Sequence, residues 1–271
     1  MLASSAMTAI QTFLLAAVFF LTSAISVVTG STSAITVPVM FQFGMEPRAA
    51  VATNMFALTF LSAGGTLPFL RGGALSRRRL PPLIAITLAG SAVGAMLLPV
   101  IPARMVPVFV SSAIIGLAVF STIYRRAGVA SDAGTSRPPM EGVGYLLTFL
   151  LGIYGGVFSG GYVTILTAVF VACFRMTFLE AIAATKLVNV FSSGIATLIF
   201  MGHGLVDYRL GLPLGAVMFV GALLGARYAR RLKETWLRRI YLAALWALAL
   251  KTLLFDVLRP AHAGDSGMPA R

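Results

Sequence analysis

Long, almost uninterrupted apolar runs most constrain the fold of this chain. A helix needs about 20 residues to cross the roughly 30 Å of hydrocarbon in a bilayer. Runs near this length cover residues 8–28, 49–70, 80–101, 105–124, 142–158, 178–202, 208–228 and 236–257. Two shorter apolar runs lie between them, at 32–43 and 161–174. This pattern predicts membrane-spanning helices and not the short alternating strands of an outer-membrane barrel.

The composition excludes a soluble enzyme and a disordered chain. Of the 271 residues, 58% are hydrophobic and only 11% are charged, whereas soluble domains carry about 25% charged residues. A chain with so little polar surface cannot coat a water-soluble globule of this size. The first residues, MLASSAMTAIQ, lack a basic segment. We therefore expect the first apolar run to be a retained helix and not a cleaved signal peptide.

The sequence repeats itself on either side of one polar loop. Shifting it by 131 residues aligns Gly, Pro, Ser and Arg positions in a single register. The matched pairs include Ser62 with Ser193, Gly73 with Gly204, Arg78 with Arg209, Pro82 with Pro213, Gly90 with Gly221, and Gly94 with Gly225. Apolar composition alone produces chance Leu and Ala matches, but it does not align residues of these types. The sequence therefore predicts an internal duplication.

Basic residues indicate that the two repeats are inverted. The formal net charge is +13, and Lys and Arg accumulate in the cytoplasmic loops of membrane proteins. If the two short runs also carry the chain across, the sides alternate and most basic loop residues fall on one side. If the short runs turn back, these residues divide almost evenly. The alternating arrangement gives each repeat an odd number of crossings, which inverts the second repeat relative to the first.

The predicted fold is an all-α polytopic membrane protein. It has two inverted repeats of about five segments each, and each repeat includes one short broken helix. We expect a first repeat (1–124), a cytoplasmic linker loop (125–141), a second repeat (142–258) and a flexible tail (259–271). Inverted repeats with matching interrupted segments are typical of secondary transporters. The alternative is a duplicated membrane scaffold that carries no substrate.

Each interrupted segment offers groups that suit an anion. The candidate binding residues are Gly30, Ser31 and Thr32 in the first break and Ser159, Gly160 and Gly161 in the second. A helix start presents unpaired N–H groups and a partial positive charge, and glycine lets an anion approach that backbone. The alternative is close helix packing through small residues.

Lys186 is the sharpest single candidate. It lies six residues after Glu180 and eight after the start of the run 178–202, which places it near the middle of the bilayer. A lysine at that depth costs about 2.5–3.5 kcal/mol on insertion scales. Asn189 follows on the same helix face, which predicts a polar interior. The functional interpretation is attraction of an anionic substrate, and the alternative is a buried ion pair with Glu180 or another acid.

The first repeat holds a matching pair, Thr53 and Asn54. The 131-residue shift aligns Asn54 with Thr185. A one-residue slip aligns Thr53-Asn54 with Thr185-Lys186 instead, and we prefer the slip because the residue types match better. Asn54 is then the neutral counterpart of Lys186, and all four residues are candidate substrate ligands.

Other chemistry has little support in the sequence. His203 and Asp207 fall in a connection, where a solvated turn is more probable than a metal site or proton relay. With one cysteine, Cys173, neither an intramolecular disulfide nor a thiolate zinc site is expected. There is no P-loop, HExxH or intramembrane GxSG motif. We therefore expect no enzyme activity, no metal and no cofactor.

Short motifs in each half resemble those of the sulfite exporter TauE/SafE family, also called the toluene sulfonate uptake permeases. The first half carries TGSTSAITVP, AVATN and RGGAL, and the second carries GGVFSGGYVTILT, AIAATK and GHGLVDYR. The similarity extends from about residue 10 to residue 255. The chain departs from the family pattern at Asn54 and Lys186, where small hydroxyl residues are more common, and at Thr167, where Pro is expected.

The resemblance implies a multi-pass carrier of the bacterial inner membrane that exports sulfite or an organosulfonate. Its expected partners are a small anion and the lipid bilayer, with no nucleic acid. Monomer and homodimer both remain open. Two alternatives are a ten-helix exporter of the drug/metabolite type, whose spans would all be full length, and a scaffold, in which an acid would seal Lys186.

Overall fold

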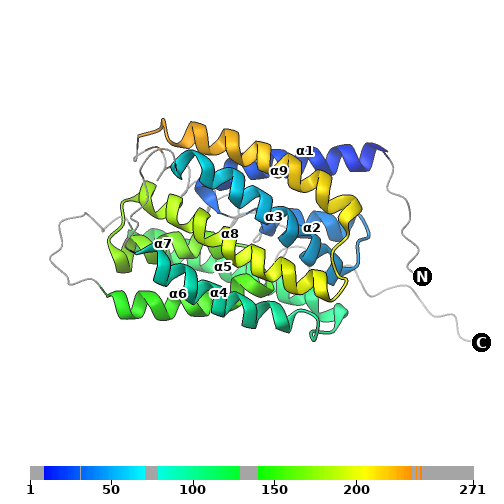
Figure 1. Cartoon of the computed structure of the whole chain (residues 1–271), viewed down its shortest axis with the longest axis horizontal. Helices are drawn as coiled ribbons and strands as arrows, with labels where there is room; N and C mark the ends of the chain where they lie inside the picture. Colours follow the sequence, from blue (N-terminus) through cyan, green and yellow to red (C-terminus); the bar gives the residue numbers. More distant parts are fainter. Residues whose placement is uncertain are drawn as a thin grey trace, which may run out of the picture.

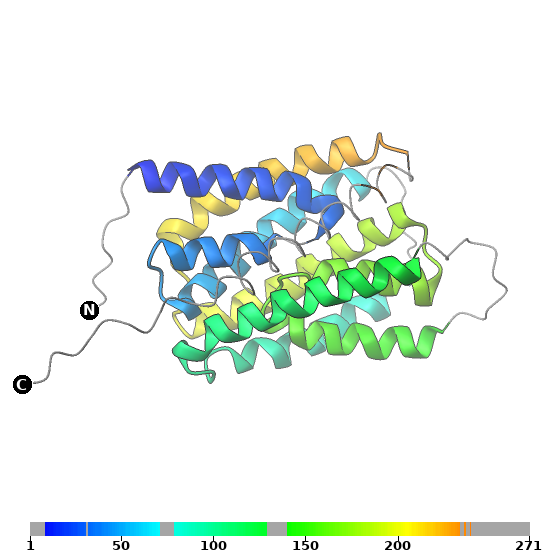
Figure 2. The same ribbon diagram turned by 180° about the vertical axis from the view of Figure 1, so that it is seen from behind.

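The computed structural model describes residues 9–30, 32–70, 79–128 and 140–233, together with Trp236 and Arg239. Throughout these ranges the chain is helical and contains no strand. The elements are α1 (Ala9–Thr29), α2 (Ser33–Gln42), α3 (Pro47–Leu70), α4 (Leu80–Leu97), η1 (Ala103–Met105), α5 (Val106–Gly128), α6 (Glu141–Val157), α7 (Tyr162–Phe174), α8 (Phe178–Gly202) and α9 (Tyr208–Ala229). Their long axes run side by side in one bundle (Figures 1 and 2).

The all-helical prediction is confirmed, and most helix boundaries fall within a few residues of those expected. Five described helices, α1, α3, α4, α8 and α9, are long and apolar enough to cross a membrane. Helix α5 continues to Gly128, beyond its expected end at residue 124, and α6 has only 17 residues because the second break ends it. The expected last span, 236–257, lies almost entirely outside the described residues.

The two short helices, α2 and α7, are flanked by the same backbone conformations. Helix α2 has 10 residues and α7 has 13. Each follows a glycine with positive φ, Gly30 at +75° and Gly161 at +80°, a conformation that glycine adopts without strain. Each is followed by a second residue with positive φ, Gly44 at +80° and Arg175 at +53°. Both pairs are 131 residues apart, so the backbone repeats with the register of the sequence.

Helix packing repeats in the same register. Gly90 and Gly94 of α4 lie directly against the backbone of α6 at Phe149 and Ile153. The matching glycines of α9, Gly221 and Gly225, lie directly against the backbone of α1 at Phe20 and Ala24. Small residues allow this close approach of helices inside a membrane. Each repeat therefore packs its fourth helix on the first helix of the other repeat.

Equivalent helices also begin at opposite ends of the bundle. Figures 1 and 2 show this for α1 and α6, for α3 and α8, and for α4 and α9. The end at which α4, α6 and α8 begin holds most of the described basic residues and is called the basic end. They are Arg79, Arg175, Arg227, Arg230, Arg231 and Lys233, against Arg48, Arg104 and Arg209 at the other end.

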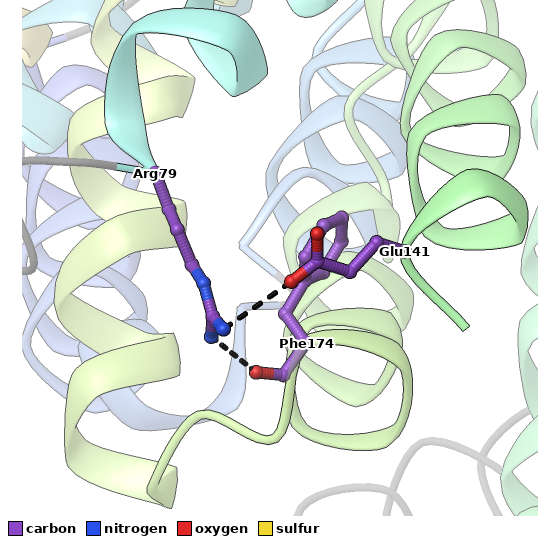
Figure 3. Close-up of polar contacts among 3 residues, drawn as sticks. All are labelled: Arg79, Glu141 and Phe174. Carbon is purple, nitrogen blue, oxygen red and sulfur yellow. Dashed lines mark hydrogen bonds and ion pairs between the residues drawn. The ribbon is translucent and has the colours of Figure 1, made fainter. Parts of the chain in front are cut away.

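Arginine side chains tie helices together at the basic end. Arg79, just before α4, forms an ion pair of 3.2 Å with Glu141 of α6 and donates to the Phe174 carbonyl of α7 at 2.5 Å (Figure 3). Arg230, just after α9, donates to the Pro68 carbonyl of α3 at 2.6 Å. Each arginine therefore stabilises a helix end of the other repeat.

Candidate functional site

Lys186 lies in the interior of the bundle, with 1% of its surface exposed. Its ammonium group donates a hydrogen bond of 2.9 Å to the carbonyl oxygen of Ser26, in the last turn of α1. The lysine stem passes Gly65 of α3. The C-terminal end of a helix carries a partial negative charge that favours a cation. Within the described ranges the one ion pair is at the basic end, and the hydrogen-bond partner of Lys186 is a helix end and not the acid of the alternative interpretation.

Asn189 extends this polar face of α8 toward α3. Its side-chain nitrogen donates to the Ser62 hydroxyl at 2.6 Å, and its backbone carbonyl accepts from the Ser193 hydroxyl at 2.5 Å. The Asn189 side-chain oxygen is buried and has no hydrogen-bond partner. Ser62 and Ser193 occupy matching positions in the two halves of the sequence, but only the contact to Ser62 joins the halves, because the contact to Ser193 lies within α8.

Asn54 and Thr185 hold equivalent places beside the two short helices. The Asn54 side chain accepts from Thr36 at 2.6 Å and donates to Ser33 at 2.9 Å, both in α2. The Thr185 hydroxyl lies 3.2 Å from that of Thr167 in α7. Thr36 and Thr167 are 131 residues apart, so the slipped register was wrong and Asn54 matches Thr185. The slipped register rested on similarity of residue type, and α3 and α8 carry different residue types at this position.

Lys186 consequently has an apolar counterpart. In the strict register it matches Met55, which is buried in the first half. The positive charge therefore occurs in the second half of the chain only, and the matching position of the first half carries no charge.

The two breaks meet in the interior. Gly30 lies so close to the start of α7 that a Cβ atom there would be 2.7 Å from the Thr164 nitrogen. The Thr164 hydroxyl donates to the Thr29 carbonyl at 2.6 Å. On the other side of the second break, the Tyr154 hydroxyl donates to the Gly160 carbonyl. Because Ser26 lies one turn before Gly30, the Lys186 ammonium also lies beside this junction.

The remaining candidates divide into two groups. Thr32 and Ser159 are buried in the breaks, where their carbonyl groups accept hydrogen bonds from the first turns of α2 and α7. Thr53 lies apart from both breaks, because its hydroxyl accepts the Asp207 N–H at 2.9 Å, at the start of α9. Its position one residue before Asn54 turns it toward a different neighbour. Ser31 lies outside the described residues.

Several buried polar residues at this centre were not among the candidate ligands of the sequence analysis. They are Ser26, Ser33, Thr36, Ser62 and Thr164. The duplication could have revealed part of this set, since Ser33 matches Thr164, Thr36 matches Thr167 and Ser62 matches Ser193. Ser26 contributes a backbone carbonyl, which no side-chain pattern indicates.

The connection before α9 is structural, as expected. The Asp207 carboxylate caps the helix by accepting from the N–H groups of Arg209 and Leu210. His203 is exposed at the end of α8. In the ranges that the structure describes, no group of three His, Cys, Asp or Glu side chains is placed to hold a metal ion.

Comparison with known proteins decides the family. The family model described as "Sulfite exporter TauE/SafE" matches residues 15–252. The chain belongs to the sulfite exporter TauE/SafE family. It is therefore a multi-pass membrane transporter, and the resemblance noted in the motifs is confirmed.

Three relatives of this TauE/SafE chain are described as probable membrane transporter proteins. ORF9 of Sinorhizobium sp. is 28% identical over 89% of this chain and 91% of its own length. YfcA of Escherichia coli K12 is 27% identical over 91% and 92%. A Haemophilus influenzae protein is 24% identical over 88% and 92%. No solved structure matches this chain significantly.

Proposed function

We propose that this transporter exports a small sulfur oxyanion, sulfite or an organosulfonate, across the bacterial inner membrane. Membership of the family suggests that the substrate contains sulfur, and the buried Lys186 suggests that the substrate is an anion. The observation that carries the proposal is the Lys186 ammonium, buried beside the junction of the two breaks and bonded to a neutral carbonyl. An isolated buried cation is unfavourable, so an entering anion gains from this charge.

In this proposal the substrate competes with the Ser26 carbonyl for Lys186. Asn189 lies on the same helix face, and its side-chain nitrogen, which donates to Ser62, is the group that offers a second contact to the anion. Gly30 and Gly161 let the chain pack closely at the breaks because neither has a side chain. The proposed binding centre is therefore built around one charge, beside the junction of the two breaks.

Transport by alternating access follows from an inverted duplication. The opposed directions of equivalent helices and their matching glycine contacts support this arrangement, in which the repeats rock about the central site. The basic end is the cytoplasmic side in this proposal, since Lys and Arg favour that side. An interior-negative potential then drives anion exit by about 2.3 kcal/mol per charge per 100 mV, without ATP.

The two rival interpretations fit the observations less well. A drug/metabolite-type exporter requires full-length spans, whereas α2 and α7 are short. A scaffold requires an acid that seals Lys186, whereas its partner among the described residues is the Ser26 carbonyl. The two short helices, and a buried Lys186 that is not paired with an acid among the described residues, favour a carrier.

Flux through purified protein tests the proposal. Proteoliposomes loaded with sulfite or methanesulfonate should release either anion when an inside-negative potential is imposed, and release should stop when the potential is collapsed. Empty liposomes and loading with a neutral sulfone provide the controls. Release that is equally fast from protein-free liposomes would refute the proposal.

A further inference from the structure

Two helix crossings that are equivalent in the 131-residue register are built differently. At the α3–α9 crossing, three glycines allow close contact: Gly64 against Phe219, Gly211 against Phe56, and Gly215 against Phe60. At the α8–α4 crossing the matching residues are Ile195, Leu80 and Ile84. Larger side chains hold helices further apart, and α4 and α8 indeed share a smaller contact than α3 and α9.

The wider crossing is also the polar one. Ser91 of α4 and Ser192 of α8 pair their hydroxyl groups at 2.7 Å. Thr87 lies one turn away on α4, and Tyr162 reaches the same place from the first position of α7. All four side chains are at most 1% exposed. The residues that match Thr87, Ser91 and Ser192 at the other crossing are Met218, Ala222 and Leu61.

Two of these four hydroxyls have unused hydrogen-bonding capacity. The Tyr162 hydroxyl lies close enough to Thr87 and Ser192 to interact with both, but no contact of the Tyr162 or Thr87 hydroxyl meets strict hydrogen-bond geometry. A buried hydroxyl without a partner is costly, and a structure usually avoids this. Two unpaired O–H donors directed into one crossing therefore suit a group that supplies acceptor oxygens.

We propose that Thr87, Ser91, Tyr162 and Ser192 form a second anion subsite, which binds the oxygen atoms of an oxyanion through neutral hydroxyl donors. This inference rests on the proposed function, because it takes the carried substrate to be an anion. The subsite is separate from Lys186, whose contacts lie on a different face of α8, with α1 and α3. Gly161 fixes the start of α7 and so places Tyr162.

The two subsites differ in a way that suits passage of an ion. Lys186 attracts the anion by charge, whereas the hydroxyl cluster holds it by neutral hydrogen bonds. Hydrogen bonds between neutral groups are weaker than those to a charged group, so binding at the hydroxyls is weaker and release is easier. The competing explanation is one buried water that bridges the hydroxyls.

Isosteric removal of the two unpaired hydroxyls tests the subsite in the full-length protein. We would purify Thr87→Val, Tyr162→Phe and the double variant. Matched controls are Thr148→Val, whose hydroxyl is satisfied within α6, and Tyr208→Phe, which is exposed. Flux is measured in proteoliposomes at low anion concentration. Thermal shifts are measured with sulfite, sulfate, methanesulfonate, phosphate and chloride.

The subsite predicts about a five- to tenfold loss of flux in each single variant, with the controls unchanged. The melting temperature without anion should not fall, because each variant removes an unpaired buried hydroxyl. At least one oxyanion should stabilise the wild type but not the double variant. A bridging water predicts no difference between the wild type and the double variant for any anion, and that result would overturn the inference.

Failure of the inference is distinguishable from failure of the proposed function. Wild-type flux of sulfur oxyanions with unaffected variants refutes only the subsite. Absence of that flux refutes the proposed function, and the thermal shifts across all five anions still decide whether the hydroxyl cluster binds an oxyanion.

Discussion

The Lys186 ammonium and the Ser26 carbonyl, separated by 2.9 Å, join the middle of α8 to the last turn of α1. The contact neutralises part of a buried charge, and it does so next to the point where α1 breaks at Gly30. In the proposed function, an anion that binds Lys186 competes with this contact and alters the end of α1. The proposal therefore couples occupation of the site to the conformation of the first break through this one hydrogen bond.

Replacement of Lys186 by Met should not destabilise the protein. A buried cation that lacks an opposite charge costs about 2.5–3.5 kcal/mol in a membrane interior, which exceeds the about 1.5–3 kcal/mol of one charge-assisted hydrogen bond. We expect the melting temperature of the purified variant to equal or exceed that of the wild type. A drop of several degrees would show that Lys186 is a structural residue.

Substitution of Gly30 by Ala should destabilise the interior junction. The residue has a φ of +75°, and a Cβ atom would lie 2.7 Å from the Thr164 nitrogen. Backbone strain of this kind costs about 1–3 kcal/mol, and the clash adds to it. Gly116→Ala is the control because its Cβ would contact nothing within 4 Å in α5. Equal thermal stability of both variants would contradict the close contact between the breaks.

Loss of the Arg79 side chain should loosen the end of α7. Arg79 holds the Phe174 carbonyl, and the buried thiol of Cys173 precedes that residue. Because Cys173 is the one cysteine of the chain, its alkylation reports on this end without further engineering. We expect several-fold faster alkylation in Arg79→Ala. The Arg230→Ala variant removes a comparable contact on α3 and should alkylate at the wild-type rate.

A faster rate in both arginine variants would indicate general loosening of the basic end. An unchanged rate in Arg79→Ala would contradict the prediction and would mean that packing alone holds the end of α7.

The fold was largely predictable because length and hydropathy determine membrane helices to within a few residues. The short helices were also predictable, since Gly30 and Gly161 interrupt the two apolar runs at matching positions. The residue of the second half that corresponds to Asn54 was not predictable. Similarity of residue type suggested Lys186, whereas the hydrogen bonds from α2 and α7 match Asn54 with Thr185.

The site was predictable only in part. The depth of Lys186 identified it as a central residue, but its partner is a backbone carbonyl, and carbonyl groups have no sequence signature. Thr53 was misplaced because neighbouring residues on a helix point about 100° apart, and its hydroxyl meets the Asp207 backbone instead of a break. The hydroxyl cluster at the α4–α8 crossing emerges only from the packing of three separate helices, α4, α7 and α8.

The central claim is that one buried charge draws the anion into the carrier, and potential-driven release from proteoliposomes tests it most directly. The comparison is between Lys186→Met and Lys233→Met, which makes the same change at an exposed lysine of the basic end. The account predicts that Lys186→Met abolishes release of sulfite and methanesulfonate, whereas Lys233→Met retains wild-type release. Release by Lys186→Met at the wild-type rate would contradict it.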